Sequence, residues 1–171
     1  MVCNLKLIVK GEKWKTNLFY TLRTGSNFSS PSRSNTNNYD HIESFKEGLS
    51  VVSKGQLYGF INENGTLVIP LQYTSASNFN EGLAFVQKGG LIGFIDKFGN
   101  TIIPLQYTDG LSFHEGLSAL KKDGKWGFID KKGNVVITFK YSDANSFTDG
   151  FAEVTENGKT FKINKTGKRV N

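Results

Sequence analysis

The sequence has little of the residues from which several kinds of protein are built. Cys3 is its only cysteine, so neither an internal disulfide nor a thiolate metal cage can form. Only three prolines occur in 171 residues, which excludes proline-rich and collagen-like chains. No apolar run approaches the roughly 20 residues of a membrane-spanning helix. The stretch from Met1 to Lys10 is interrupted by Lys6 and lacks a small-residue cleavage site, so we expect a cytoplasmic location rather than export.

Positive charge is concentrated at the two ends of the chain. Residues 1–44 carry six basic and three acidic groups, residues 45–158 ten and twelve, and residues 159–171 five and none. The last five are Lys159, Lys162, Lys165, Lys168 and Arg169. Nucleic-acid surfaces need cations clustered on a folded face, whereas these residues are predicted to form a solvated basic tail. No nucleic-acid partner is therefore expected.

The dominant feature of the sequence is an internal repeat of 34 positions. Four phenylalanines recur at this spacing, and each is followed, after one variable residue, by an acid and a glycine. They are Phe45, Phe79, Phe113 and Phe147, with the acids Glu47, Glu81, Glu115 and Asp149. Such a period is typical of repeat proteins, in which one unit is too small to fold alone and neighbouring units share a core.

Each repeat contains short apolar runs and a turn signal. Those of the second repeat are 83–86, 93–95 and 101–103. Runs of this kind suit strands that are covered on both faces. Between the second and third runs an Asn or Asp precedes a glycine by three positions, as in Asp96 and Gly99, which is typical of a type I turn. We predict a three-stranded antiparallel meander per repeat, with the segment from Tyr107 to Phe113 and its equivalents linking units or adding a fourth strand.

The third repeat resembles a known family. After Phe113 with its acid and glycine, it contains Gly-Lys-Trp-Gly-Phe-Ile-Asp at 124–130 and ends in Tyr141. This pattern is similar to that of the bacterial WG-repeat family, and the resemblance covers most of the chain. It implies an array of β repeats with a binding or scaffolding role, and it implies no reaction. In the other three repeats, Tyr58, Ile92 and Thr160 stand at the position of Trp126.

The repeat also predicts a domain organisation. Residues 45–171 form four units, the last truncated and degenerate: 45–78, 79–112, 113–146 and 147–171. Residues 1–44 are predicted to hold a degenerate first repeat around Trp14, with a Ser- and Asn-rich insertion, and all units belong to one structural domain. We expect an all-β fold of stacked repeats in an open array, with a closed propeller of about five blades as the alternative.

Equivalent side chains are expected to be buried between successive units. Phe79, Phe94 and Ile103, with their counterparts, are predicted to supply that core. Gly93 and Gly127 stand in mid-strand, where a missing side chain indicates a close neighbour, and we expect this neighbour to be an aromatic ring. The repeated acids are attributed to the geometry of the fold, because catalytic carboxylates need unlike surroundings.

The sequence says less about function than about architecture. No catalytic, metal-binding or cofactor-binding residue is expected, because His41, His114 and Cys3 do not make a nucleophile, base and orienting group. We expect a non-catalytic module that binds another protein. The alternatives are a polysaccharide- or cell-envelope-binding module with exposed rings as platforms, and an enzyme with its site near Trp14 or His41. The candidate binding residues are Trp14, Tyr58, Tyr73, Tyr107, Trp126 and Tyr141.

Overall fold

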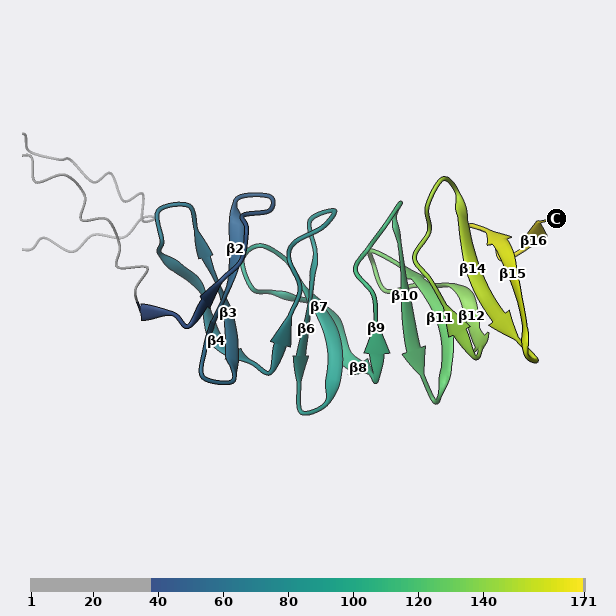
Figure 1. Ribbon diagram of the computed structural model, residues 1–171, viewed down its shortest axis with the longest axis horizontal. Helices are drawn as coiled ribbons and strands as arrows, with labels where there is room; N and C mark the ends of the chain where they lie inside the picture. Colours follow the sequence, from purple (N-terminus) through teal and green to yellow (C-terminus); the bar gives the residue numbers. More distant parts are fainter. Residues whose placement is uncertain (1–37, 171) are drawn as a thin grey trace, which may run out of the picture. The chain divides into compact units, whose positions relative to one another are not determined.

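The computed structural model describes residues 38–170, which form sixteen β-strands in four sheets (Figure 1). The first sheet contains β1 (His41–Ile42), β2 (Leu49–Lys54), β3 (Leu57–Asn62) and β4 (Leu67–Tyr73). The second contains β5 (Ser75–Ala76), β6 (Ala84–Lys88), β7 (Leu91–Ile95) and β8 (Thr101–Tyr107). The third contains β9 (Asp109–Gly110), β10 (Leu117–Lys122), β11 (Lys125–Asp130) and β12 (Val135–Tyr141). The fourth contains β13 (Asp143–Ala144), β14 (Phe151–Glu156), β15 (Lys159–Asn164) and β16 (Arg169–Val170).

Every sheet is an antiparallel meander in which neighbours in sequence are neighbours in space. The prediction of all-β repeats is confirmed, and the segment before each phenylalanine adds a fourth strand of two residues. In the second sheet this strand pairs Ser75 with Gln87 and Ala76 with Val86. The predicted insertion and the repeat around Trp14 lie outside the described residues.

Two kinds of turn set the register of the meanders. Asp96 begins the turn predicted from sequence: its Oδ1 accepts hydrogen bonds from the amides of Phe98, at 2.9 Å, and Asn100, at 2.8 Å. Gly99 completes this turn with a φ of +84°. The hairpin between β14 and β15 has positive φ at both Asn157 and Gly158, the type I′ geometry that Asn-Gly favours.

The mid-strand glycines allow two backbones to approach closely. A Cβ on Gly93 would lie 2.5 Å from the carbonyl oxygen of Ile103 and 2.8 Å from the amide nitrogen of Leu105. The pairing of β7 with β8 shifts register beside this glycine, between Ile92 and Phe94, as at a β-bulge. The expectation of an aromatic neighbour is therefore wrong for Gly93, because the main chain of the next strand occupies the space. At Gly127 a Cβ would lie 2.9 Å from the ring of Phe139 as well as 2.7 Å from the carbonyl oxygen of Ile137, so an aromatic neighbour is present there.

Aromatic pairs join successive sheets. Phe94 and Phe113 have ring centroids 4.8 Å apart, in an edge-to-face arrangement, and both side chains are fully buried. Equivalent pairs are Phe60 with Phe79, at 5.0 Å, and Phe128 with Phe147, at 4.9 Å. The predicted core positions Phe79 and Ile103 are also buried. Each unit is thus stabilised through the unit next to it.

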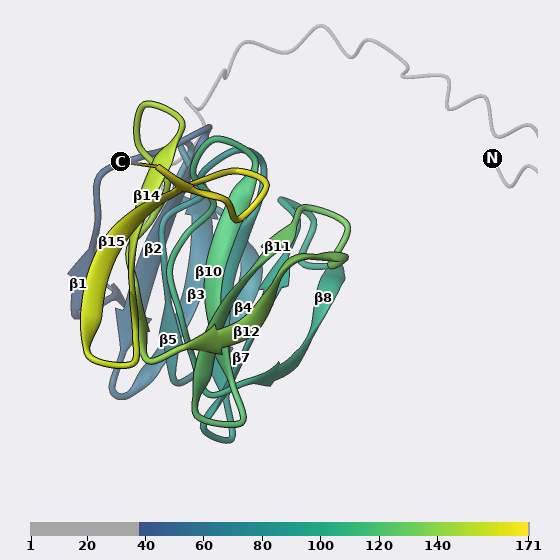
Figure 2. The ribbon, with the colours of Figure 1, turned by 90° about the vertical axis from the view of Figure 1, so that its right-hand side faces the viewer.

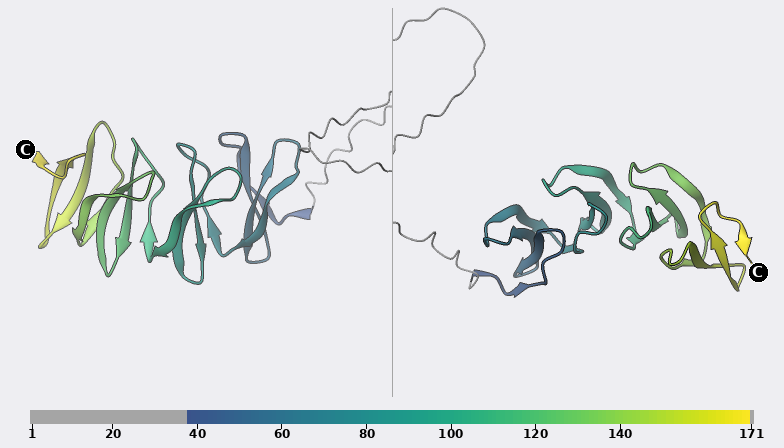
Figure 3. Two further views of the ribbon diagram at one scale, coloured as in Figure 1. Left: turned by 180° about the vertical axis from the view of Figure 1, so that it is seen from behind. Right: turned by 90° about the horizontal axis from the view of Figure 1, so that it is seen from above.

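The described sheets follow one another in a row. The buried apolar residues form clusters that span the first and second sheets, the second and third, and the third and fourth. None of these clusters contains residues from both the first and the fourth sheet. Figures 2 and 3 show the same order from the end and from two other sides. For residues 38–170 the open array is confirmed, and the sheets do not close into a propeller.

Candidate functional site

The repeated acids form clasps between successive sheets. Glu115 has a φ of +52°, and its Oε2 lies 3.0 Å from the amide nitrogen of Gly150 and 3.0 Å from Nζ of Lys165. The same contacts join Glu47 to Gly82 and Lys97, and Glu81 to Gly116 and Lys131. Each carboxylate therefore ties its own unit to two turns of the following unit. One turn holds the bonded glycine, and the other holds the lysine and precedes the last strand of that sheet.

Electrostatics keep two of these clasp carboxylates in their charged form. The hydrogen bond from Lys165 lowers the pKa of Glu115 below its ordinary value of 4.5, against partial desolvation, and the Gly150 amide adds to the effect. At Glu47, desolvation raises the pKa, but the bonds from Lys97 and Gly82 outweigh it and the pKa is lowered. A carboxylate with a lowered pKa is a poor proton donor at neutral pH.

Most of the candidate binding rings belong to the core. Trp126 is 7% exposed and Tyr73 is 6% exposed, and Tyr107 and Tyr141 are more deeply buried. They lie in the clusters that join successive sheets, so the expectation of open platforms is wrong for these four rings. Tyr58 is partly buried against the first of those clusters. Trp14 lies outside the described residues.

Exposed apolar side chains follow the fourth strand of each of the first three sheets instead. We call these residues the outer row: Val68 and Pro70 on β4, Ile102 and Pro104 on β8, and Val136 on β12. They alternate with buried residues such as Ile69 and Ile103, because successive side chains of a strand point to opposite faces. Val68, Ile102 and Val136 are 38%, 41% and 44% exposed. Each of the three strands is the edge strand of its sheet.

A further exposed apolar side chain lies outside the strands. Phe98 is 84% exposed in the turn that leads into β8. The outer row is not evident from sequence, because Thr-Ile-Ile at 101–103 reads as one buried run. The available signal is the recurrence of Val68, Ile102 and Val136 at intervals of 34 positions.

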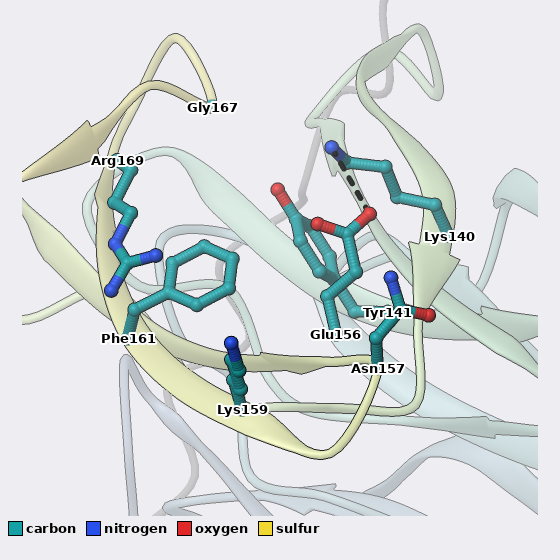
Figure 4. A pocket seen from close by; sticks show the side chains of 8 residues that line it. All are labelled: Lys140, Tyr141, Glu156, Asn157, Lys159, Phe161, Gly167 and Arg169. Carbon is teal, nitrogen blue, oxygen red and sulfur yellow. Dashed lines mark ion pairs between the residues drawn. The ribbon is translucent and has the colours of Figure 1, made fainter.

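The fourth sheet carries a different feature, a hollow of about 380 Å³ between β12 and the β14–β15 hairpin (Figure 4). It is lined by Lys140, Tyr141, Glu156, Asn157, Lys159, Phe161, Gly167 and Arg169. Lys159 and Arg169 belong to the predicted basic tail, which is therefore not a tail: β15, its following turn and β16 hold these cations on a folded sheet.

Among residues 38–170, no three His, Cys, Asp or Glu side chains are grouped as metal ligands would be. Nor does that part of the chain contain a helix with the length and apolar character needed to cross a membrane. His114 is exposed, with its Nε2 3.5 Å from Nδ2 of Asn80.

Comparison with known proteins identifies the repeat. The family model described as WG containing repeat matches the chain four times in succession. The matched segments are 38–58, 58–91, 92–126 and 126–159. Together these segments include all of the first three sheets and the first half of the fourth. A comparison with curated proteins found no match.

Proposed function

The chain belongs to the WG containing repeat family, and from this membership we propose that it is a non-catalytic binding or scaffold module for another protein. The observation that carries the proposal is the outer row. It offers a protein partner the same apolar side chains, at equivalent places, on three successive sheets.

The repetition of the outer row is what distinguishes it from ordinary surface. Single exposed apolar residues are common on folded proteins, whereas contiguous or repeated ones mark interaction surfaces. The core already has Ile69, Ile103 and Ile137 on the inner faces of the same strands, so folding does not require aliphatic residues outside. Edge strands with apolar outer faces are also accessible to a partner, because one side of each is not paired within its own sheet.

The chemistry of the outer row favours a protein over a polysaccharide. Its members are valine, isoleucine and proline, which offer aliphatic surface and no flat ring. Sugar-binding surfaces commonly use the faces of tryptophan and tyrosine, but Trp126 and Tyr107 are turned into the core here. The clasp acids bind backbone amides and lysines of the next unit, which supports a structural use of the most regular charges.

Site-specific cross-linking would test this proposal. A photoreactive phenylalanine derivative placed at Ile102, and separately at Val136, should cross-link the same protein from cells that produce the chain. The same derivative at Gln56, an exposed residue in a hairpin turn of the first sheet, is the matched control and should not cross-link that protein.

Purified components then decide whether the contact contributes to affinity. Val68→Lys should weaken binding of the cross-linked protein by about tenfold or more, because a charge must be desolvated at an apolar contact. Gln56→Lys adds the same charge to the same sheet and should leave the affinity unchanged. Equal binding by both variants, with both folded by circular dichroism, would contradict the proposal.

A further inference from the structure

The hollow on the fourth sheet exists because that sheet departs from the repeat. Phe161 stands at the position that is glycine in the first three sheets. Those glycines are Gly59, Gly93 and Gly127. In the fourth sheet the ring of Phe161 packs against Tyr141 of the preceding unit, with centroids 6.4 Å apart. The guanidinium of Arg169 lies over the same ring at 4.6 Å from its centroid.

The hollow has an excess of positive charge. Lys140, Lys159 and Arg169 line it, with Glu156 as the single carboxylate. Nζ of Lys140 lies 3.5 Å from Oε1 of Glu156, so these two charges offset each other. Lys159 and Arg169 take part in none of the ion pairs formed among residues 38–170. Two positive charges therefore face the hollow without a carboxylate partner there.

Further departures from the repeat converge on this place. Lys140 replaces the glutamine of the two preceding units, Gln72 and Gln106. Arg169 replaces Leu67, Thr101 and Val135. Neither replacement is required by the meander, since the first two sheets form it with uncharged residues at both positions. If these replacements only made the surface polar, any polar residue would serve at either position. Lysine and arginine instead place hydrogen-bond donors around one hollow.

The donors surround a common space. Figure 4 shows Arg169 and Lys159 on the side of Phe161, with the Tyr141 hydroxyl and the Glu156 carboxylate opposite and Lys140 beyond them. The Asn157 amide also lines the hollow. Stacking on Phe161 orients the guanidinium, whose planar fork can donate two parallel hydrogen bonds to one anion. Lysine, a hydroxyl and an amide supply the remaining donors.

We propose that this hollow binds a phosphate monoester group. A dianion balances the two unpaired positive charges, and its three terminal oxygens can use the guanidinium fork and the Lys159 ammonium together. A carboxylate has one charge and two oxygens, and would leave part of this donor set unused. The inference concerns the hollow between β12 and the fourth sheet and is independent of the protein-binding role proposed for the outer row.

A titration with phenyl phosphate, followed by amide and side-chain NMR shifts, would test the inference. We expect saturable shifts at Asn157, Phe161 and Arg169, with sodium chloride of equal ionic strength as the reference. Methyl phenyl phosphate, a monoanionic diester, should bind more weakly because it has lost one charge and one terminal oxygen. Shifts that do not saturate, or that sodium chloride reproduces, would overturn the proposal.

Matched variants separate a local site from general attraction by a basic surface. Arg169→Gln should weaken phenyl phosphate binding about tenfold or more, as expected for loss of a charge-assisted, bidentate contact. Lys168→Gln removes the same charge one residue away, on an exposed side chain that does not line the hollow. It should change the affinity by less than about twofold, since exposed charges are screened.

Two further measurements complete the test. Lys159→Gln should also weaken binding while leaving the spectrum of the first three sheets unchanged, which guards against a folding defect in the Arg169 variant. Equal losses in Arg169→Gln and Lys168→Gln would overturn the proposal. If it holds, a phosphoserine peptide and a sugar phosphate compared under the same conditions would show which source of the phosphate binds more tightly.

Discussion

One position of the repeat carries different residues on the inner faces of the first three sheets and on the corresponding face of the fourth. Phe60, Phe94 and Phe128 each pack against a phenylalanine of the following unit. The fourth sheet has Lys162 at this position, and it is exposed. A face that another unit covers is apolar, and a face without a described neighbour is polar. The repeat therefore encodes the junction between units as much as the unit itself.

A second contrast separates the strand pairings. Because Gly93 has no Cβ, the backbone of β8 can lie against that of β7 in the space that a Cβ would occupy. In the fourth sheet β16 is only two residues long, and Phe161 occupies the equivalent of that glycine. The ring then supplies one wall of the hollow. The departure that ends the regular pairing also makes room for a site that the inner units cannot form.

Truncating one of the stacked rings should give the largest effect. Phe94→Ala removes a fully buried side chain that packs against Phe113, and should lower the free energy of unfolding by about 3–5 kcal/mol. Lys162→Ala, at the equivalent exposed position, should change it by no more than about 0.5 kcal/mol. Urea denaturation of the two variants provides the measurement, and similar losses in both would remove the distinction between junction and end.

Adding one methyl group in mid-strand should have an intermediate effect. Gly93→Ala forces β7 and β8 apart, because the obstructing atoms belong to the main chain of Ile103 and Leu105, and should cost about 1–3 kcal/mol. Gly110 offers a control in which the obstructing atom belongs to a side chain, that of Leu120. At this pair the second and fourth sheets have alanine in place of the glycine and valine in place of the leucine, as Ala76 with Val86 and Ala144 with Val154.

A double substitution distinguishes these two obstacles. Gly110→Ala should be destabilising alone and should be relieved when combined with Leu120→Val, because the pair then matches that of the second and fourth sheets. No single side-chain truncation should relieve Gly93→Ala. Thermal unfolding of the single and double variants would measure the coupling, and additive losses in the Gly110 cycle would show that the size match has no energetic role.

The smallest effect is expected at a clasp, and it should depend on pH. The pKa of Glu115 is lowered in the folded protein, chiefly by Lys165, so its stabilising contribution is complete above the unfolded value of 4.5 and is lost as pH falls through the folded pKa. Glu115→Gln should therefore unfold at a lower temperature than the unmodified chain at neutral pH, and the difference should shrink below pH 4.5.

The control for the clasp is a carboxylate at the polar end. Glu153 is exposed and belongs to none of the ion pairs among the described residues. Glu153→Gln should leave the unfolding temperature unchanged at neutral pH. A difference between Glu115→Gln and the unmodified chain that stays constant through acid pH would show that the carboxylate acts through its shape and not through its charge.

Much of the fold could be predicted because the same strand and turn signals recur in successive repeats. The recurrence of Phe79 and its equivalents predicts burial between units, and the Asp96 to Gly99 pattern predicts a turn with positive φ at glycine. The sequence does not decide whether the segment before each phenylalanine forms a strand. Ser75–Ala76 carries no alternating pattern of its own and forms a strand only by pairing with β6. Tertiary contacts decide such short elements.

The candidate site was harder to predict than the fold. An aromatic residue reads the same in sequence whether it faces a ligand or the next unit, so Trp126 and Tyr141 are candidate binding residues by sequence although both are buried. The hollow depends on Lys140 and Arg169, which are 29 positions apart in sequence and line the same space only in the folded chain. Charges that look like a tail in sequence are thereby placed around one ring.

The sequence by itself determined the period, the strands and their turns, because backbone conformation at glycine and Asx residues and the spacing of apolar side chains are local properties repeated in each unit. Only the tertiary structure decided which face of each strand is covered and which backbones touch at the bulges. It also decided which charges converge on the fourth sheet. These outcomes depend on contacts between residues of different units, which are far apart in the sequence.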